Sequence, residues 1–188
     1  DAVLEDGKER TLCVLPLFHI YALTVNMNFG IAGGGELILR PKFELDAVMK
    51  DLDKKKPTVF PGVPTMYMAI ANHPEVSKYD LSSLKFCASG GAPLPVEVQD
   101  HFQKVTGCRL LEGWGMTETN ALGIGMIGDD YKARPDSAGK LHPPVQELRM
   151  LDDAGNDVPL GALGEITVKS PANMRCYLNK PEATDEVL

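Results

Sequence analysis

Paired cysteines, long apolar runs and an excess of positive charge are all missing from this sequence of 188 residues. The scattered cysteines, Cys13, Cys87, Cys108 and Cys176, form no C-x-x-C pair. This pattern disfavours a cysteine-rich zinc site and indicates buried, reduced thiols. The most apolar stretch, residues 20–34, is short and interrupted by asparagines and glycines, so no transmembrane segment is expected. There is no signal-peptide pattern either, and the sequence therefore predicts a cytoplasmic location.

Charge and composition narrow the class of protein further. The net charge is −7, whereas nucleic-acid-binding proteins present Lys- and Arg-rich faces to the phosphate backbone. A nucleic-acid partner is therefore not expected. Hydrophobic residues make up 44% and charged residues 24% of the chain, which is typical of a globular protein rather than a disordered chain or a coiled coil. No feature of the sequence indicates an oligomeric state.

The first 140 residues alternate short apolar runs with helical patterns. The clearest helix covers residues 44–55, where Leu45, Val48, Met49 and Leu52 follow the i, i+3, i+4, i+7 spacing of one helix face. Such alternation predicts an α/β fold, in which a layered mixed or parallel sheet is flanked by helices. The expected strands cover residues 11–15, 36–40, 58–60, 85–88 and 109–111, and the other expected helices cover residues 20–29, 64–71 and 95–105.

Glycine and proline mark the expected ends of several elements. Gly30 is expected to end the first helix, and Pro61 with Gly62 is expected to break the third strand. Pro64 opens the next helix in the first turn, where proline is tolerated. Gly107 is expected to stop the last helix.

The pattern changes after about residue 140. Residues 147–151 and 165–169 have strand character and are joined through a turn-forming stretch, residues 152–156. These features predict the start of a small antiparallel β-subdomain. We therefore expect an α/β subdomain over residues 1–140 and part of a β-subdomain over residues 141–188.

Two loops that follow expected strands carry residues suited to a ligand. The first, residues 88–94, contains Gly90 and Gly91, and backbone without Cβ atoms lets a flat ligand approach closely. In open α/β sheets, ligands bind beyond the carboxyl ends of the strands, where this loop would lie. From these residues alone, a tight strand-to-helix turn without a ligand is an equally good interpretation.

The second loop, residues 111–119, combines two glycines with the only tryptophan, a hydroxyl and a carboxylate. Trp114 is flanked by glycines and is poorly suited to core packing, whereas stacking an aromatic ring on a nucleobase contributes roughly 1–3 kcal/mol. Thr117 has a hydroxyl that can donate to a phosphate. Glu118 is the kind of oxygen ligand that Mg²⁺ accepts together with substrate phosphates. A solvated loop carboxylate remains the alternative for Glu118.

Two glycine-rich stretches resemble nucleotide motifs but are rejected. Residues 123–128 match G-x-G-x-x-G, with Glu147 at roughly the distance of a ribose-binding acid. The stretch that follows, residues 129–136, has no apolar helical face and contains a proline, so it cannot supply the helix that a dinucleotide site requires. Residues 33–35 lack the Lys-Ser/Thr of a phosphate-binding loop.

Taken together and in order, the motifs resemble those of the adenylate-forming (AMP-binding) superfamily, which includes acyl-CoA synthetases, luciferases and peptide-synthetase adenylation domains. Within it the chain is most similar to the central part of the large N-terminal domain of a long-chain fatty-acid–CoA ligase. The aromatic of the signature is usually tyrosine, and Trp114 keeps its flat face but lacks its hydroxyl. The motifs are the aromatic–histidine segment (residues 15–19), a proline turn (63–66), the adenine loop (89–94), the signature segment (113–119) and a distal block (161–166 and 177–184).

The resemblance implies a role for each matching residue. Thr117 and Glu118 would be catalytic, with Glu118 holding magnesium. The residues implied around adenine and AMP are Gly90, Gly91, Ala92, Pro93, Gly113, Trp114, Gly115, Met116 and Thr117. Those implied around the acyl group are His19, Ile20, Tyr21, Met66, Ala88, Ala121, Leu122 and Gly123. For His19, a core histidine with a backbone partner remains an alternative.

The resemblance also implies a reaction in two halves. A carboxylic acid and ATP, with magnesium, form an acyl-adenylate and pyrophosphate, and coenzyme A then displaces AMP. The expected acyl pocket is apolar, which favours a fatty acid; an aryl acid is the alternative, and an amino acid is disfavoured because no acidic residue is placed to bind an ammonium group. A non-catalytic nucleotide-binding or scaffolding module of the same fold is the competing class.

The triphosphate-binding loop, the ribose-binding aspartate and the catalytic lysine of the family are not found in these 188 residues. We therefore predict that this chain alone has negligible ligase activity, because the groups that neutralise the triphosphate are missing. Acid-dependent exchange of pyrophosphate into ATP is the measurement. Detectable exchange by the 188-residue chain would contradict the prediction.

Overall fold

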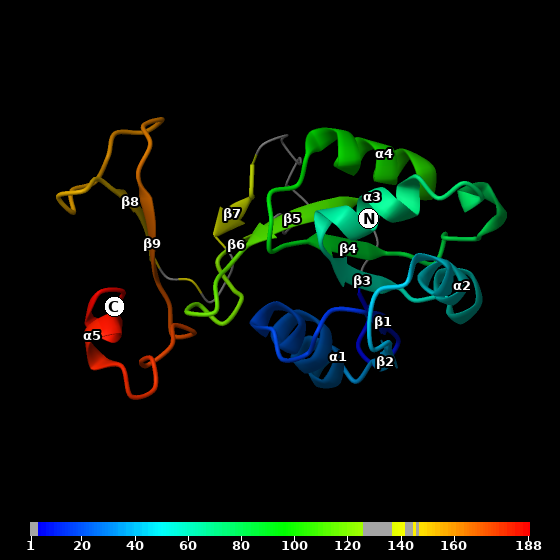
Figure 1. The fold of residues 1–188 in the computed structure, drawn as a ribbon, viewed down its shortest axis with the longest axis horizontal. Helices are drawn as coiled ribbons and strands as arrows, with labels where there is room; N and C mark the ends of the chain where they lie inside the picture. Colours follow the sequence, from blue (N-terminus) through cyan, green and yellow to red (C-terminus); the bar gives the residue numbers. More distant parts are fainter. Residues whose placement is uncertain (1–3, 126–136, 142–144, 146) are drawn as a thin grey trace.

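The computed structural model describes residues 4–125, 137–141, 145 and 147–188. Within these residues, a seven-stranded sheet has the strand order β2-β1-β3-β4-β5-β6-β7 (Figure 1). The first five strands in this order, from β2 to β5, pair in parallel, and the pairings of β5 with β6 and of β6 with β7 are antiparallel. The strands are β1 (Arg10–Cys13), β2 (Glu36–Leu39), β3 (Val59–Gly62), β4 (Phe86–Ser89), β5 (Leu110–Trp114), β6 (Ile124–Gly125) and β7 (Lys140–Leu141). The expected α/β class with a mixed sheet is confirmed.

The order of the strands determines which face each helix covers. The chain steps from β1 to β2 in one direction and then crosses back to β3, β4 and β5 in the other. Because crossovers between parallel strands are right-handed, the helical segment after β1 covers one face and the later helices cover the opposite face. The first segment consists of η1 (Ala22–Asn28, a π-helix) and α1 (Phe29–Ala32); the later helices are α2 (Leu45–Lys55), α3 (Pro64–Ala71), η2 (Val76–Lys78) and α4 (Val96–Thr106).

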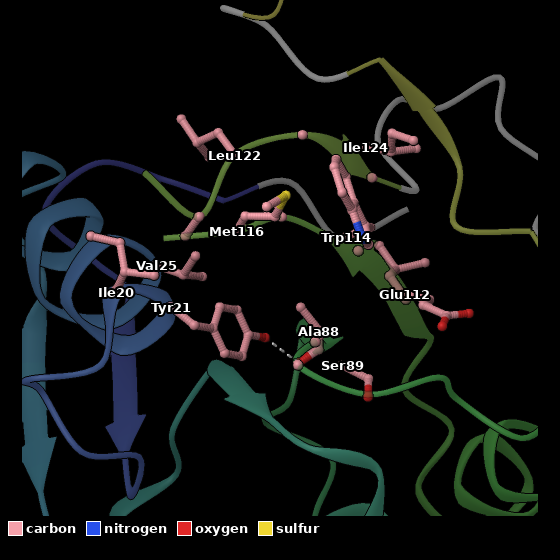
Figure 2. A pocket seen from close by; sticks show the side chains of 18 of the residues that line it. Ile20, Tyr21, Val25, Ala88, Ser89, Glu112, Trp114, Met116, Leu122 and Ile124 are labelled. Atoms are coloured by element: carbon pink, nitrogen blue, oxygen red, sulfur yellow. Dashed lines mark hydrogen bonds between the residues drawn. The ribbon is translucent and has the colours of Figure 1, made fainter. Parts of the chain in front are cut away.

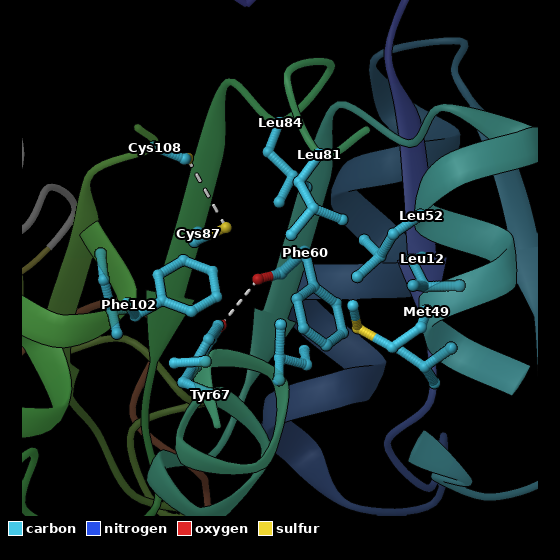
Figure 3. Packing of buried hydrophobic residues seen from close by; sticks show 14 of the residues in the cluster. Leu12, Met49, Leu52, Phe60, Tyr67, Leu81, Leu84, Cys87, Phe102 and Cys108 are labelled. Atoms are coloured by element: carbon cyan, nitrogen blue, oxygen red, sulfur yellow. Dashed lines mark hydrogen bonds between the residues drawn. The ribbon is translucent and has the colours of Figure 1, made fainter. Parts of the chain in front are cut away.

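The hydrophobic core lies between the sheet and the later helices (Figure 3). Its centre is Tyr67 of α3, whose ring makes edge-to-face contacts with Phe60 at 5.5 Å and Phe102 at 5.0 Å between centroids. The Tyr67 hydroxyl is also satisfied, because its single O–H is shared between the carbonyls of Phe60 and Ala88, each at 2.7 Å. Burial raises the pKa of Tyr67 well above its ordinary value, so the phenol stays a neutral donor. The reduced thiols of Cys87 and Cys108 are buried here, as the sequence predicts, whereas Cys176 is exposed, contrary to that prediction.

Helix ends follow the expected chemistry. α2 buries Val48, Met49 and Leu52, and it ends at Lys56, which adopts a left-handed conformation with φ 49°. α3 has a proline at its first position. α4 ends at Gly107, where φ is 73°.

Several expected boundaries were wrong, including that of β1, which ends at Cys13 rather than at residue 15. Helical structure continues past Gly30 to Ala32. The glycine at this position is explained by packing on the sheet, since a Cβ there would lie 2.4 Å from Leu37. Strand β3 includes Pro61 and Gly62, which pair with Ala88 and Ser89 of β4. Proline is tolerated at this position because the ladder between β1 and β3 contains only one residue pair and ends before it. Strand β5 also continues further than expected, through Trp114.

The C-terminal region forms a second, two-stranded antiparallel sheet, which Figure 1 shows beyond the end of the large sheet. Its strands are β8 (Glu147–Leu151) and β9 (Glu165–Lys169), followed by the short helix α5 (Pro181–Asp185). The turn after β8 is stabilised by Asp152, whose carboxylate accepts hydrogen bonds from the backbone N–H groups of Ala154 and Asn156. The expected antiparallel hairpin is confirmed. The boundary near residue 140 stays a prediction.

No helix in the part of the chain that the structure describes is long and apolar enough to cross a membrane.

The core geometry predicts a large difference between two phenylalanines. Phe102 is fully buried against Tyr67, whereas Phe18 is 92% exposed. Phe102→Ala should lower the free energy of unfolding by about 3–5 kcal/mol, because it leaves a cavity in the core. Phe18→Ala is the matched control and should change it by less than about 0.5 kcal/mol. Urea denaturation of both variants is the measurement, and equal losses would contradict this assignment of the core.

Candidate active site

A cavity of about 350 Å³ lies at the carboxyl ends of β4 and β5, on the face of the sheet opposite the core. Successive side chains of a strand point to opposite faces of the sheet, so the residues of β4 and β5 divide between the cavity and the core. Phe86 and Ala88 of β4 line the cavity together with Leu111 of β5, whereas Cys87 and Leu110 are buried in the core. The sheet therefore forms a wall with packed helices on one side and a ligand-sized space on the other.

The opposite wall comes from the helical segment after β1 (Figure 2). Tyr21, Val25 and Phe29 recur every four residues and all line the cavity. The Tyr21 hydroxyl donates a 2.8 Å hydrogen bond to the carbonyl of Ala88. Burial raises the pKa of Tyr21, so its phenol remains protonated. The Tyr21 ring also lies so close to the adenine loop that a Cβ on Gly90 would be 3.1 Å from it. π-Helical turns within α-helices are rare and are often found at functional sites.

Trp114 is held at the end of β5 by the antiparallel pairing with β6. Trp114 pairs with Ile124, and Gly113 pairs with Gly125. A Cβ on Gly123 would lie 2.6 Å from the indole ring and 2.7 Å from the carbonyl oxygen of Trp114. The indole therefore packs on bare backbone, and Gly123 fixes where the ring lies in the cavity wall.

The chain between these two strands makes a tight turn that holds Thr117. Thr119 is 3% exposed; its hydroxyl accepts from the N–H of Met116 at 3.0 Å and donates to the carbonyl of Met116 at 3.2 Å. Asn120 and Ala121 have φ of 55° and 65°, a left-handed conformation that is costly for a residue with a Cβ and is concentrated at functional sites. The turn thus presents Thr117, which is exposed, at the cavity wall.

Glu118 follows Thr117 but does not line the cavity. It is partly buried, and its carboxylate accepts a hydrogen bond from the hydroxyl of Tyr177. Among the described residues there is no group of three or more His, Cys, Asp or Glu side chains that could hold a metal alone. Mg²⁺ is usually held by one or two carboxylates together with substrate phosphates and waters. A single carboxylate beside a hydroxyl therefore fits magnesium bound with a nucleotide.

The structure brings most of the residues implied by the resemblance to one cavity. Those that line it are His19, Ile20, Tyr21, Ala88, Gly90, Gly91, Gly113, Trp114, Gly115, Met116, Thr117, Ala121, Leu122 and Gly123. Ala92 and Pro93 lie exposed in the adenine loop, outside the lining. Met66 also lies outside it and packs against the core from α3. His19 is exposed, and its Nδ1 accepts from the N–H of Tyr21 at 3.2 Å, which argues against a buried core histidine.

Sequence reasoning missed several lining residues. Val25 and Phe29 were detectable from their spacing to Tyr21, and Phe86 and Leu111 from strand alternation, but neither signal says which face of a sheet carries a cavity. Glu112 also received no role. Its carboxylate accepts a 3.0 Å hydrogen bond from the N–H of Leu94, which ties the adenine loop to the strand that carries Trp114.

Comparison with known proteins agrees with this geometry. A model of the family described as "AMP-binding enzyme" matches residues 2–178, and the chain therefore belongs to this family. It is 44% identical over 186 residues to a long-chain-fatty-acid–CoA ligase of Bacillus subtilis, covering 98% of this chain and 33% of the relative.

Solved structures have the same fold. The crystal structure of the anthranilate CoA ligase AuaEII in complex with anthranoyl-AMP superimposes with a TM-score of 0.90 at 29% identity, over 97% of this chain and 35% of that one. ATP-bound MatB from Rhodopseudomonas palustris superimposes with a TM-score of 0.86 at 30% identity, over 96% and 35% of the two chains. The chain thus spans about a third of the length of these relatives.

The contact between Gly123 and Trp114 predicts the effect of one added methyl group. Gly123→Ala should displace the indole, lower the free energy of unfolding by about 1–3 kcal/mol and shift the emission of the only tryptophan. Gly113→Ala is the matched control on the paired strand, because its Cβ would make an ordinary 3.5 Å contact with Ile124. Fluorescence-monitored urea denaturation is the measurement. An unchanged emission spectrum and midpoint in Gly123→Ala would show that the ring is not held in this way.

Proposed function

We propose that the protein containing this chain is an ATP-dependent acyl-CoA ligase that activates a carboxylic acid, preferably a fatty acid, as its acyl-adenylate. One observation carries the proposal: a single cavity joins the adenine loop, the signature segment and an apolar helix face. The first two motifs suit a nucleotide, and the helix face suits an acyl group. Membership of the AMP-binding enzyme family supports the same conclusion.

In the first half-reaction, the carboxylate of the acid attacks the α-phosphorus of ATP, and pyrophosphate leaves. The acid is already ionised at neutral pH, so the step depends on positioning and on neutralising the charge of two anions rather than on a general base. Thr117 would donate a hydrogen bond to phosphate, and Glu118 would hold magnesium. Magnesium bound there would neutralise negative charge on the phosphates.

The binding roles follow from the cavity walls. Trp114 would stack on adenine, and the bare backbone of Gly90 and Gly91 would border the same ring. The acyl group would lie along Tyr21 and Val25, with His19 at the rim. In the second half-reaction, the thiol of coenzyme A attacks the acyl carbonyl, and AMP leaves. Coenzyme A, like magnesium, is part of this proposal.

The apolar character of the lining favours a fatty acid over a polar acid. The Bacillus subtilis relative, named as a long-chain-fatty-acid–CoA ligase, supports this choice. An aryl acid is the second candidate, since the AuaEII structure holds anthranoyl-AMP in the same fold. The ratio of kcat/KM for a long-chain fatty acid to that for a benzoate separates the two. The cytoplasmic location remains a prediction, which cell fractionation would test.

The role of Trp114 predicts how the full-length protein binds a non-hydrolysable acyl-adenylate analogue. Trp114→Ala should lose about 1–3 kcal/mol of binding free energy, which corresponds to about 5- to 150-fold in Kd. Trp114→Phe is the control and should retain much of the affinity, because it keeps an aromatic face. Isothermal titration calorimetry is the measurement. Equal affinity of wild type and Trp114→Ala would contradict stacking, and no acid-dependent pyrophosphate exchange by the full-length protein would favour a non-catalytic module.

A further inference from the structure

The second part of the distal block, residues 177–184, is called the distal motif below. It has no role in the proposed function, yet it contacts the signature segment directly. The hydroxyl of Tyr177 donates a hydrogen bond to Oε1 of Glu118. The backbone N–H of Met174 donates to the carbonyl of Glu118 at 2.8 Å. One C-terminal segment therefore holds residue 118 by both its main chain and its carboxylate.

Lys180 and Thr184 lie at the positions of the distal motif from which they can hold the backbone of Tyr177. The backbone N–H of Tyr177 donates to the hydroxyl of Thr184 at 3.0 Å, and that hydroxyl donates to the carbonyl of Lys180 at 2.9 Å. The N–H of Lys180 closes the loop on the carbonyl of Tyr177 at 3.1 Å. Asn179, with φ of 56°, makes the sharp turn that this closure requires. Tyr177 is thus anchored at its backbone, while its ring extends to Glu118.

The bond between the phenol and the carboxylate suits a positioning role. A phenol, whose ordinary pKa is about 10, is a neutral donor at neutral pH. A neutral donor orients a carboxylate without cancelling its charge. Carboxylates that bind metals are commonly held by such hydrogen bonds, and removing the partner typically weakens metal binding by about 10- to 100-fold.

We propose that Tyr177 is a positioning residue that holds Glu118 ready to bind the divalent cation that accompanies the nucleotide, and that Thr184 fixes Tyr177 in place. This inference rests on the proposed function, because it takes Glu118 as the metal ligand. It assigns the distal motif to the metal site rather than to the adenine or acyl site. Acid and adenine binding should therefore be nearly independent of the Tyr177 hydroxyl.

The test is Mn²⁺ binding to the full-length protein in the presence of ATP, followed by electron paramagnetic resonance of the free ion. Tyr177→Phe should raise the Kd of Mn²⁺ by about tenfold, and the Mg²⁺ concentration for half-maximal activity should rise in parallel. The KM for the acid at saturating Mg²⁺ should not change. Thr184→Ala should weaken Mn²⁺ binding in the same direction, and Thr184→Ser should restore it, because serine keeps the hydroxyl that binds Tyr177.

Tyr79→Phe is the matched control, since Tyr79 is also partly buried but packs its ring against His73. It should leave the Kd of Mn²⁺ unchanged. If Tyr177→Phe left the Kd of Mn²⁺ unchanged or lowered it, while the wild-type protein catalysed acid-dependent pyrophosphate exchange, the role of Tyr177 would be overturned but the proposed function would stand. A lower Kd would mean that Tyr177 masks Glu118. A wild-type protein without acid-dependent exchange would instead overturn the proposed function.

Discussion

The carbonyl of Ala88 accepts hydrogen bonds from two phenols that approach from opposite faces of the sheet. Tyr67 reaches it from the core at 2.7 Å, and Tyr21 reaches it from the cavity at 2.8 Å. Burial raises the pKa of both tyrosines, so both remain donors. A carbonyl oxygen has two lone pairs and can satisfy both. Because Ala88 immediately precedes the adenine loop, this shared acceptor links the packing of α3, the position of the cavity wall and the start of the loop.

The second constraint is the close approach of backbone to backbone around the signature segment. A Cβ on Gly115 would lie 2.3 Å from the carbonyl oxygen of Ala121, and Ala121 itself has a left-handed backbone. Backbone neighbours cannot move aside as a flexible side chain can. The cost of this conformation is offset by hydrogen bonds such as that from the N–H of Ala121 to the carbonyl of Met116, at 2.8 Å. Position 115 therefore has no room for a side chain, and only glycine fits this turn without moving the backbone.

Sequence reasoning predicted the fold class because hydrophobic periodicity is local and strong, as in α2, whose buried face follows its spacing. It failed where a residue serves a distant contact. The sequence predicts a helix end at Gly30, but this glycine makes room for Leu37. It also predicts a strand break at Pro61, although the ladder between β1 and β3 ends before this residue and leaves it free to stay in the strand. The cavity lining was partly predicted because motif residues cluster in sequence. The bond between Glu118 and Tyr177 joins residues 59 positions apart, and no periodicity or motif spacing encodes that pairing.

The contacts of Glu118 also have a thermodynamic consequence for the second sheet. The segment that contains Met174 and Tyr177 follows β9 directly, and its bonds to residue 118 connect the two sheets. Coupling between binding equilibria is reciprocal. If docking of this segment orients Glu118 for a cation, then a bound cation must stabilise the docked segment by the same free energy.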